Sequence, residues 1–292
     1  MKKKAFAATL VALLTANVRA DTVGLYLGSQ IWQSEANGVL GEKNTLINFD
    51  LKKEKPSYYF VAVEHPFPLL PNVRISSTTF ETTGKTNLTQ AFSFGGGKFP
   101  AEDVIEVPDG EFIIDTKLDT KLNASFNVSY VDYTLYYELF DNGLFSFDLG
   151  LTGRDFDGTV TVTGTTDVVA TTDVKDHPGH TPDHIGSEIT GTTSDKGKIQ
   201  INEIEPMLNI ATNISFPLTG LSLYAQGDYS LKNEHSLFEY QVGLNYDLID
   251  SRMMDFNITL GYRFAKMEFE YLDDLYMNIE VKGAFVGVIA HF

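Results

Sequence analysis

Apolar and polar residues alternate with a period of two over most of the chain, in segments of roughly ten residues. In the segment NITLGYRF (257–264), every second residue is apolar, and the residues between them are Asn, Thr, Gly and Arg. Successive side chains of a β-strand point to opposite faces. Each such segment therefore predicts a strand with one face suited to lipid and one suited to a polar interior. About ten residues is also the length of a tilted strand that crosses a bilayer.

The alternation predicts ten strands. They are residues 22–33, 57–65, 72–81, 123–140, 144–158, 199–216, 221–232, 236–247, 255–270 and 276–292. Short turns are expected at residues 66–72, 141–143, 217–220 and 247–252. The Thr-rich polar stretch 162–198 is interpreted as one long loop, and the segments 44–55 and 92–99 either add strands or fold over the rim. We therefore expect an all-β fold, a single antiparallel transmembrane β-barrel of about ten strands (8–12), with short periplasmic turns and long outer loops.

The first twenty residues have the composition of a secretory signal peptide. Lys2, Lys3 and Lys4 precede an apolar run, and a small residue, Ala20, ends the segment. The apolar run is too short for a transmembrane helix. We expect residues 1–20 to be removed and residues 21–292 to form the barrel, in the outer membrane of a Gram-negative cell.

The last residues, GAFVGVIAHF, predict a final strand with an apolar face that ends at Phe292. A terminal Phe after alternating apolar residues resembles the signal by which the outer-membrane assembly machinery recognises barrels. The expected partners are therefore this machinery, through the Phe292 strand, and the lipid and lipopolysaccharide of the outer membrane.

The net charge and the cysteine content exclude several classes of binding partner and covalent modification. Without Lys2, Lys3, Lys4 and Arg19, 18 of the 22 basic residues remain against 39 acidic ones, a net charge of −21. Such acidity argues against nucleic acid and against anionic lipid held by broad basic patches, whereas small cations are compatible with it. The chain has no cysteine, so it forms no disulfide, thiolate metal site or lipoprotein anchor.

Three segments resemble a family of Gram-negative outer-membrane β-barrel proteins that carry an export signal. They are VAVEHPFPLLPNVRI (61–75), YTLYYELFDNGLFSFDLGLTGRDFDG (133–158) and the terminal HF. The specific signature is the turn EHPxPLLPNVR, whose prolines cannot donate to a sheet ladder and so predict a rigid periplasmic turn. The resemblance implies the fold and the location, and it implies no activity.

Eight charged residues fall on the faces that the alternation turns toward the barrel interior. They are Arg74, Asp132, Glu138, Asp148, Arg154, Asp228, Glu239 and Arg263. In a lumen, these carboxylates either line a narrow cation pore or pair with the arginines in a sealed polar core. The lumen of about ten strands is narrow and largely filled by side chains, which favours the sealed core.

A surface hydrolase would need a His held beside a carboxylate or a Ser at hydrogen-bond distance. His235, in the LKNEHS connection near the outer rim, is the candidate, but Ser236 next to it points to the opposite face of a strand. His65 belongs to the proline turn and His291 to the final strand. The FGGG run at 94–97 shares only its glycine content with phosphate-binding loops, and a turn is expected there. We expect no catalytic residue.

Three further histidines, His177, His180 and His184, lie together in DHPGHTPDHIG (176–186) among several carboxylates. Imidazole with carboxylate suits zinc, copper or nickel. Prolines and a glycine between the histidines exclude a helix, and a bound ion would have to offset the ordering of the whole loop. A hydrophilic acidic outer loop is the favoured interpretation, a weak divalent metal site is the alternative, and no other cofactor is expected.

The sequence thus predicts an outer-membrane β-barrel with a structural or surface-interaction role and a largely sealed polar core. A narrow, porin-like channel or transporter for small cations or solutes is the alternative, and a surface hydrolase is a weaker one. A channel predicts conductance in planar bilayers, and a hydrolase predicts turnover that is lost in His235→Ala.

Overall fold

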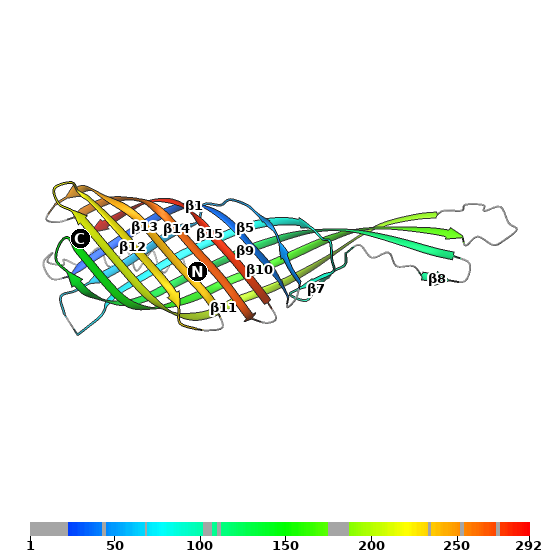
Figure 1. Ribbon diagram of the computed structural model, residues 1–292, viewed down its shortest axis with the longest axis horizontal. Helices are drawn as coiled ribbons and strands as arrows, with labels where there is room; N and C mark the ends of the chain where they lie inside the picture. Colours follow the sequence, from blue (N-terminus) through cyan, green and yellow to red (C-terminus); the bar gives the residue numbers. More distant parts are fainter. Residues whose placement is uncertain are drawn as a thin grey trace.

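The protein is a closed antiparallel β-barrel of ten strands (Figure 1). The computed structural model describes residues 23–42, 45–67, 69–101, 107–109, 112–174, 187–232, 235–251, 254–272 and 275–292. The ring consists of β1 (Gly24–Glu42), β4 (Ser57–Glu64), β5 (Asn72–Asn87), β9 (Phe112–Asp141), β10 (Phe145–Val174), β11 (Ser187–Phe216), β12 (Leu221–Ser230), β13 (His235–Asp250), β14 (Asp255–Leu272) and β15 (Leu275–His291). Each strand pairs antiparallel with the next, and β15 pairs with β1 to close the ring. The predicted fold class is confirmed.

Five shorter strands accompany the ring. They are β2 (Thr45–Asn48), β3 (Asp50–Leu51), β6 (Phe92–Phe94), β7 (Gly97–Phe99) and β8 (Val107–Asp109). β2 folds back on β1, β3 adds to β5, and β8 adds to the end of β9. β6 and β7 pair only with each other, as a separate hairpin. The segments at 44–55 and 92–99 therefore do add strands, although none of them enters the ring.

Three ring strands extend past the others, because β9, β10 and β11 each have 30 residues. β5 ends where Asn87 pairs with Lys121, which in turn pairs with Thr165, and Thr165 pairs with Ser194. Beyond this level, residues 112–121, 165–174 and 187–194 continue the sheet as three strands, with β8 beside the end of β9. This extension, here called the ribbon, projects along the long axis of the molecule (Figure 1).

The ribbon corrects the prediction of one long loop at residues 162–198. β10 continues to Val174 and β11 begins at Ser187, so most of that stretch is paired strand. The physical reason is that threonine, abundant there, is β-branched and favours extended backbone, whereas the ladder itself is made by the backbone and needs no apolar side chain.

The barrel wall is apolar outside and polar inside in the half nearest the short turns, here called the belt. Leu135 and Leu151 are more than half exposed on its outer surface, whereas their neighbours Thr134 and Thr152 face inward and are buried. Further exposed apolar residues of the belt are Tyr133, Leu149, Ile210, Ile214, Val242, Leu244, Ile258, Leu260, Val286 and Val288. This arrangement is the one that lipid around a barrel requires.

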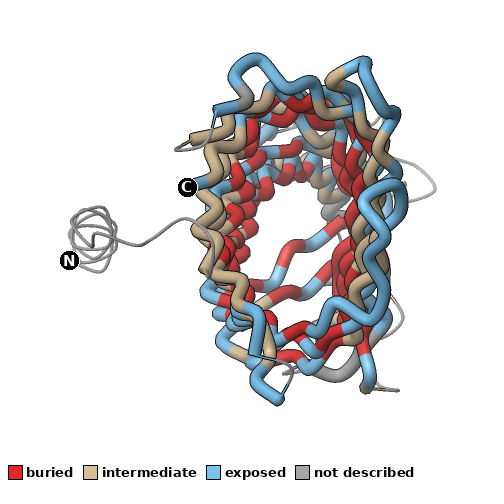
Figure 2. The backbone as a smooth tube through the Cα atoms, turned by 90° about the vertical axis from the view of Figure 1, so that its left-hand side faces the viewer, coloured by how far each residue is buried: buried red, intermediate tan, exposed pale blue. Residues whose placement is uncertain are grey.

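The polarity inverts in the half of the barrel nearest the ribbon, here called the upper barrel. Phe126 and Val128 of β9 face the interior and are buried, whereas the adjacent Ser125 and Asn127 are exposed. Buried residues line the interior all along the barrel, as the view along its axis shows (Figure 2). The lumen therefore contains two layers, a polar one at the level of the belt and an apolar one above it.

The β6–β7 hairpin fills part of the upper barrel with three phenylalanines. Phe92, Phe94 and Phe99 are at most 2% exposed and belong to the apolar core. At the hairpin's tip, Gly95 and Gly96 adopt positive φ angles of 54° and 84°, which glycine adopts without strain, so the turn expected in the FGGG run is present.

A glycine on the facing strand lets the hairpin approach β11. A Cβ atom added to Gly197 would lie 1.7 Å from the carbonyl oxygen of Phe94, so no other residue fits there without a shift of the backbone. Lys198 N–H donates to Gly95 O (3.1 Å), and Lys98 N–H donates to Asp195 Oδ2 (2.8 Å). These contacts fix the hairpin to the edge of β11.

Candidate functional site

The polar layer of the lumen is organised by an ion pair between neighbouring strands. Arg154 of β10 lies directly opposite Asp132 of β9, and both side chains point inward. Arg154 donates from Nε to Asp132 Oδ1 (2.7 Å) and from Nη2 to Asp132 Oδ2 (3.0 Å). This two-point geometry is the strongest form of a carboxylate–guanidinium pair.

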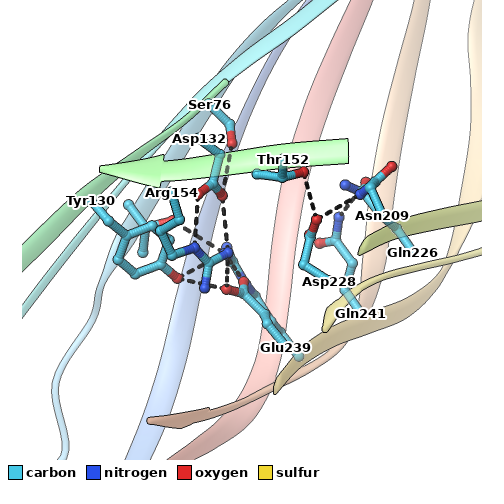
Figure 3. A network of polar contacts seen from close by, with 12 residues as sticks. Ser76, Tyr130, Asp132, Thr152, Arg154, Asn209, Gln226, Asp228, Glu239 and Gln241 are labelled. Atoms are coloured by element: carbon cyan, nitrogen blue, oxygen red, sulfur yellow. Dashed lines mark hydrogen bonds and ion pairs between the residues drawn. The ribbon is translucent and has the colours of Figure 1, made fainter. Parts of the chain in front are cut away.

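A second ion pair comes from the far wall and joins the first (Figure 3). Glu239 of β13 accepts hydrogen bonds from Arg263 of β14 and lies 2.8 Å from Arg154 Nη2. Tyr130 of β9 also donates to Glu239 Oε2 (2.8 Å). One carboxylate therefore connects strands from opposite sides of the barrel.

Asp228 of β12 forms the other side of the layer without a direct ion pair. It accepts hydrogen bonds from Thr152 Oγ1 (2.9 Å) and Asn209 Nδ2 (2.8 Å), and it is 7% exposed. Gln241 and Gln226 form a neighbouring hydrogen bond of 3.3 Å (Figure 3). A buried carboxylate retains its charge at lower cost when donors of this kind replace its water shell.

Aromatic rings cover the two guanidinium groups. The Cζ atom of Arg154 lies 4.0 Å from the ring centre of Tyr130, and that of Arg263 lies 4.5 Å from Tyr58 and 5.2 Å from Trp32. Rings within about 6 Å attract a cation through their quadrupole. The arginines are thus held by both carboxylates and rings, which allows them to be buried to 2–3% exposure.

A small cavity lies among the side chains of the polar layer. It has a volume of about 10 Å³ and lies between Ser76, Asp132, Asp228 and Arg263, among others. That volume accommodates about one water molecule. At this level, paired charges connect opposite walls of the barrel.

Three of the eight predicted lumen residues lie apart from this network, nearer the short turns. Arg74 packs over the rings of Tyr136 (5.2 Å) and Phe60 (5.6 Å), and Asp148 is half-buried on β10, opposite Glu138. Glu138 is exposed at the barrel mouth. The other five, Asp132, Arg154, Asp228, Glu239 and Arg263, form the polar layer.

The mouth at the short-turn end contains a cavity of about 660 Å³. Glu64, Glu138, Tyr26 and His291 are among its lining residues. Glu64 accepts a hydrogen bond from the Tyr136 hydroxyl (2.7 Å). The cavity is therefore bordered by carboxylates and aromatic rings, a lining compatible with small cations.

His65 holds the proline turn together. Its ring accepts from Phe67 N–H at Nδ1 (3.3 Å) and contacts the carbonyl oxygen of Pro71 through Nε2 (3.2 Å). The side chain of Asn72 accepts from the His65 N–H (3.0 Å). The EHPFPLLPN sequence thus supplies the partners for its own backbone, and His65 has a structural role in the turn.

Of the remaining histidines, the structure describes two, His291 and His235. His291 stacks on Tyr26, with ring centres 4.2 Å apart, and its Nδ1 atom lies 3.2 Å from Asp255 Oδ2. His235 begins β13 and pairs with Phe269 of β14. His177, His180 and His184 lie outside the described residues, so the metal site there stays a prediction. Among the residues that the structure describes, no group of three or more His, Asp and Glu is placed to hold a metal ion.

Uncharged residues complete the polar layer, and the sequence did not single them out. Tyr130, Thr152, Asn209 and Ser76 each bond a predicted charged residue. The same alternation that turns Asp132 and Arg154 inward also turns Tyr130 and Thr152 inward. The sequence alternation could therefore have shown that these side chains face the lumen. It could not have shown which residues they contact across the lumen, because those contacts depend on which distant strands face each other.

The β6–β7 hairpin, which lies above the polar layer, is anchored by the solvent-exposed carboxylate of Asp195. Asp195 Oδ2 accepts the Lys98 N–H, and Asp195 Oδ1 accepts the N–H of Lys196 (2.7 Å). These two backbone donors stabilise the charged form and lower the pKa of Asp195 below its ordinary value.

Comparison with known proteins gives little beyond the architecture. Neither a protein-family model nor a curated protein sequence matches the chain. Among solved structures, the attachment invasion locus protein Ail of Yersinia pestis, in complex with the heparin analogue sucrose octasulfate, is 10% identical (92% of this chain, 99% of that chain, TM-score 0.22). The translocator domain of the autotransporter NalP from Neisseria meningitidis is 10% identical (99% and 94%, TM-score 0.31), and a Pseudomonas aeruginosa FadL homologue is 7% identical (93% and 90%, TM-score 0.29).

Similarity at this level carries no information on function. The family resemblance of the EHPxPLLPNVR turn therefore stays a prediction. In the part of the chain that is described, no helix is both long and apolar enough to cross a membrane.

Proposed function

We propose that the protein is an outer-membrane β-barrel with a closed lumen, whose working part is the ribbon that it carries beyond the membrane. One observation carries the proposal: β9, β10 and β11 have 30 residues each. About ten residues cross a bilayer, so about 20 residues of each strand lie beyond the belt. A barrel that served only to span the membrane has no need of that length.

The filling of the lumen supports a surface-interaction role over transport. The polar layer joins opposite walls through Glu239, and the β6–β7 hairpin occupies the apolar layer above it. A solute would meet these two barriers in series. The alternative, a narrow cation channel, is favoured by the cavity of about 660 Å³ at the mouth, with Glu64 and Glu138 in its lining.

The orientation follows from the turns. Bacterial barrels have short turns on the periplasmic side, and the ribbon is at the opposite end of the ring. The ribbon then points away from the cell, the belt contacts outer-membrane lipid, and lipopolysaccharide surrounds the upper barrel. The Phe292 strand, which closes the ring with β1, is the partner of the assembly machinery.

Two measurements on the full-length mature protein test the proposal. The refolded barrel in planar bilayers is expected to give no conductance, and cation-selective steps that change in Glu138→Gln and Asp148→Asn would overturn the closed lumen. In intact cells, a membrane-impermeant maleimide is expected to label Thr165→Cys in the ribbon and to spare Asn142→Cys in a short turn. The chain has no cysteine of its own, so each label has one site. The reverse labelling would overturn the orientation.

A further inference from the structure

One edge of the ribbon has no strand beside it. Residues 187–194 of β11 pair with β10, whereas β11 pairs with β12 only from Met207 onward. In the described ranges of the chain, no other strand pairs with this part of β11. Unpaired backbone N–H and C=O groups at a strand edge are a ready template for a further strand.

The hairpin contact shows which residues direct their backbone groups to this edge. Lys198 N–H donates to Gly95 O, so it points away from β10. The register between β10 and β11 is unbroken, and the direction of the N–H group alternates along a strand. Glu188, Thr190, Thr192 and Ser194 therefore also point their N–H and C=O groups to the open edge.

The middle of this edge, from Ile189 to Ser194, lacks the features by which proteins usually prevent strand addition. Such features are charged side chains, proline and bulges. The six residues from Ile189 to Ser194 are uncharged, contain no proline and form no bulge with β10. They are exposed on both faces of the ribbon. Threonine and isoleucine among them favour the extended conformation.

We propose that this edge pairs with the same edge of a second copy of the protein that projects from an opposite membrane. The inference rests on the proposed function, because it requires the ribbon to point away from the cell. The edge is compatible with itself. In an antiparallel pair centred on Gly191, Thr190 faces Thr192, Ile189 faces Thr193 and Glu188 faces Ser194.

This register brings all four hydrogen-bonding residues of each chain into the ladder and leaves the hairpin contacts at Asp195 and Lys198 in place. No like charges meet across the pair, and Thr opposite Thr is a favourable cross-strand combination. The overall negative charge of the two chains opposes their approach. Salt at physiological concentration screens that repulsion beyond about 8 Å.

Strand direction determines where the second copy comes from. The ribbon runs along the long axis of the barrel (Figure 1), so two copies in one membrane present parallel β11 strands. In a twofold dimer of that kind, each N–H of the edge faces the same N–H of its mate, and no ladder forms. Two copies in apposed membranes present antiparallel strands, which the register above requires.

The association between one pair of ribbon edges is weak, but many such pairs between two membranes strengthen each other. Each solvent-exposed backbone hydrogen bond contributes little, since water competes for the same groups. Two surfaces that each carry many copies gain from effective concentration, by factors of about 10² to 10⁴. We therefore expect association between membranes and little dimer in dilute solution.

Proteoliposomes that contain the full mature chain test the proposal. At 0.15 M salt, vesicles with the unmodified protein are expected to aggregate, and turbidity is expected to fall to the level of protein-free vesicles with Thr190→Pro. Proline removes an N–H that faces the open edge and leaves the β10 ladder intact. The matched variant Thr190→Ser keeps the N–H and should aggregate normally. Aggregation that persists in Thr190→Pro, or none with the unmodified chain, overturns the pairing.

A crosslink tests the register. In Gly191→Cys, the Cα atoms of the two residues 191 are expected about 4.5 Å apart, within the range of a disulfide. No atom lies within 4 Å of a Cβ built on Gly191, so the substitution fits. In Thr193→Cys, the two residues are about 13 Å apart along the strands and should not crosslink. Vesicles of two sizes, mixed under mild oxidation, should give dimer between the populations in the first variant only.

The outcomes separate this inference from the proposed function. Maleimide labelling of the ribbon in cells, together with absence of aggregation, would leave the outward ribbon in place and overturn the pairing. Dimer formed equally by both cysteine variants would mean random collision and would also overturn it.

Discussion

Arg154 and Asp132 face each other across β10 and β9 and share two hydrogen bonds, of 2.7 and 3.0 Å, while their side chains are only 2% and 7% exposed. The same guanidinium contacts Glu239 from the opposite wall. Removal of Arg154 therefore leaves Asp132 without its cation and leaves Glu239 with Arg263 alone.

Arg154→Leu should lower the free energy of unfolding by about 3–5 kcal/mol, because breaking one side of a buried pair leaves an uncompensated charge. Urea titration of the barrel in lipid vesicles measures it. As a control, Lys121→Leu removes an exposed pair with Asp119 (3.3 Å) and should cost about 0–1 kcal/mol. Adding Asp132→Asn to Arg154→Leu should recover part of the loss. Equal stability of the two single variants would contradict the role given to the polar layer.

Conductance should appear only when both barriers in the lumen are removed. Deletion of the hairpin, residues 92–99, leaves the polar layer, and Glu239→Ala with Arg263→Ala leaves the hairpin. Each change alone should remain silent in planar bilayers, and their combination should give steps. Steps from the hairpin deletion alone would show that the polar layer does not block ions.

Gly197→Ala should displace the hairpin, because the new methyl group would lie 1.7 Å from the Phe94 carbonyl oxygen. A spin label on Ser93→Cys, at an exposed position of the hairpin, reports the displacement as increased mobility. Gly191→Ala, with nothing within 4 Å of the added atom, is the matched control. A label that stays immobile in Gly197→Ala would argue that the hairpin is held by its phenylalanines alone.

Acid should release the same hairpin. Backbone donors lower the pKa of Asp195, so its contribution to anchoring is complete above the unfolded pKa of about 3.9 and is lost as pH falls through the lower folded value. The mobility of the Ser93→Cys label should therefore be constant from pH 7 to about pH 5 and rise below about pH 4. In Asp195→Asn this rise should be absent. A rise of the same size in both proteins would assign the effect to other carboxylates.

Alternation in the sequence was sufficient for the ring but not for the ribbon. In the belt, one face of each strand meets lipid, so residues 57–65 and 255–270 were predicted within two residues of β4 and β14. β9 and β10 were predicted at 123–140 and 144–158, and the structure extends them to Phe112 and Val174. Along residues 188–194 of β11 both faces are exposed, and there the period-two signal disappears although the backbone ladder continues.

The alternation of inward and outward positions predicted which charged residues face the lumen, but it did not predict which of them form ion pairs with each other. Parity turns Asp132, Asp228 and Glu239 inward, yet it cannot tell that Glu239 rather than Asp228 reaches Arg154. That choice depends on the diameter and stagger of the closed ring. The hairpin was missed as a filling element for a related reason, because Phe92, Phe94 and Phe99 find their partners on strands distant in sequence.

The continuity of β9, β10 and β11 from the belt to the tip has a mechanical consequence. A force applied to the end of the ribbon is transmitted along the backbones of β9, β10 and β11 to the barrel wall, because each of these strands is continuous from the ribbon into the wall. Ladder hydrogen bonds lie perpendicular to the strands, so such a load shears many of them together rather than opening them one at a time. Under such a load, the barrel wall would hold the base of the ribbon, and the ribbon would resist extension along its length.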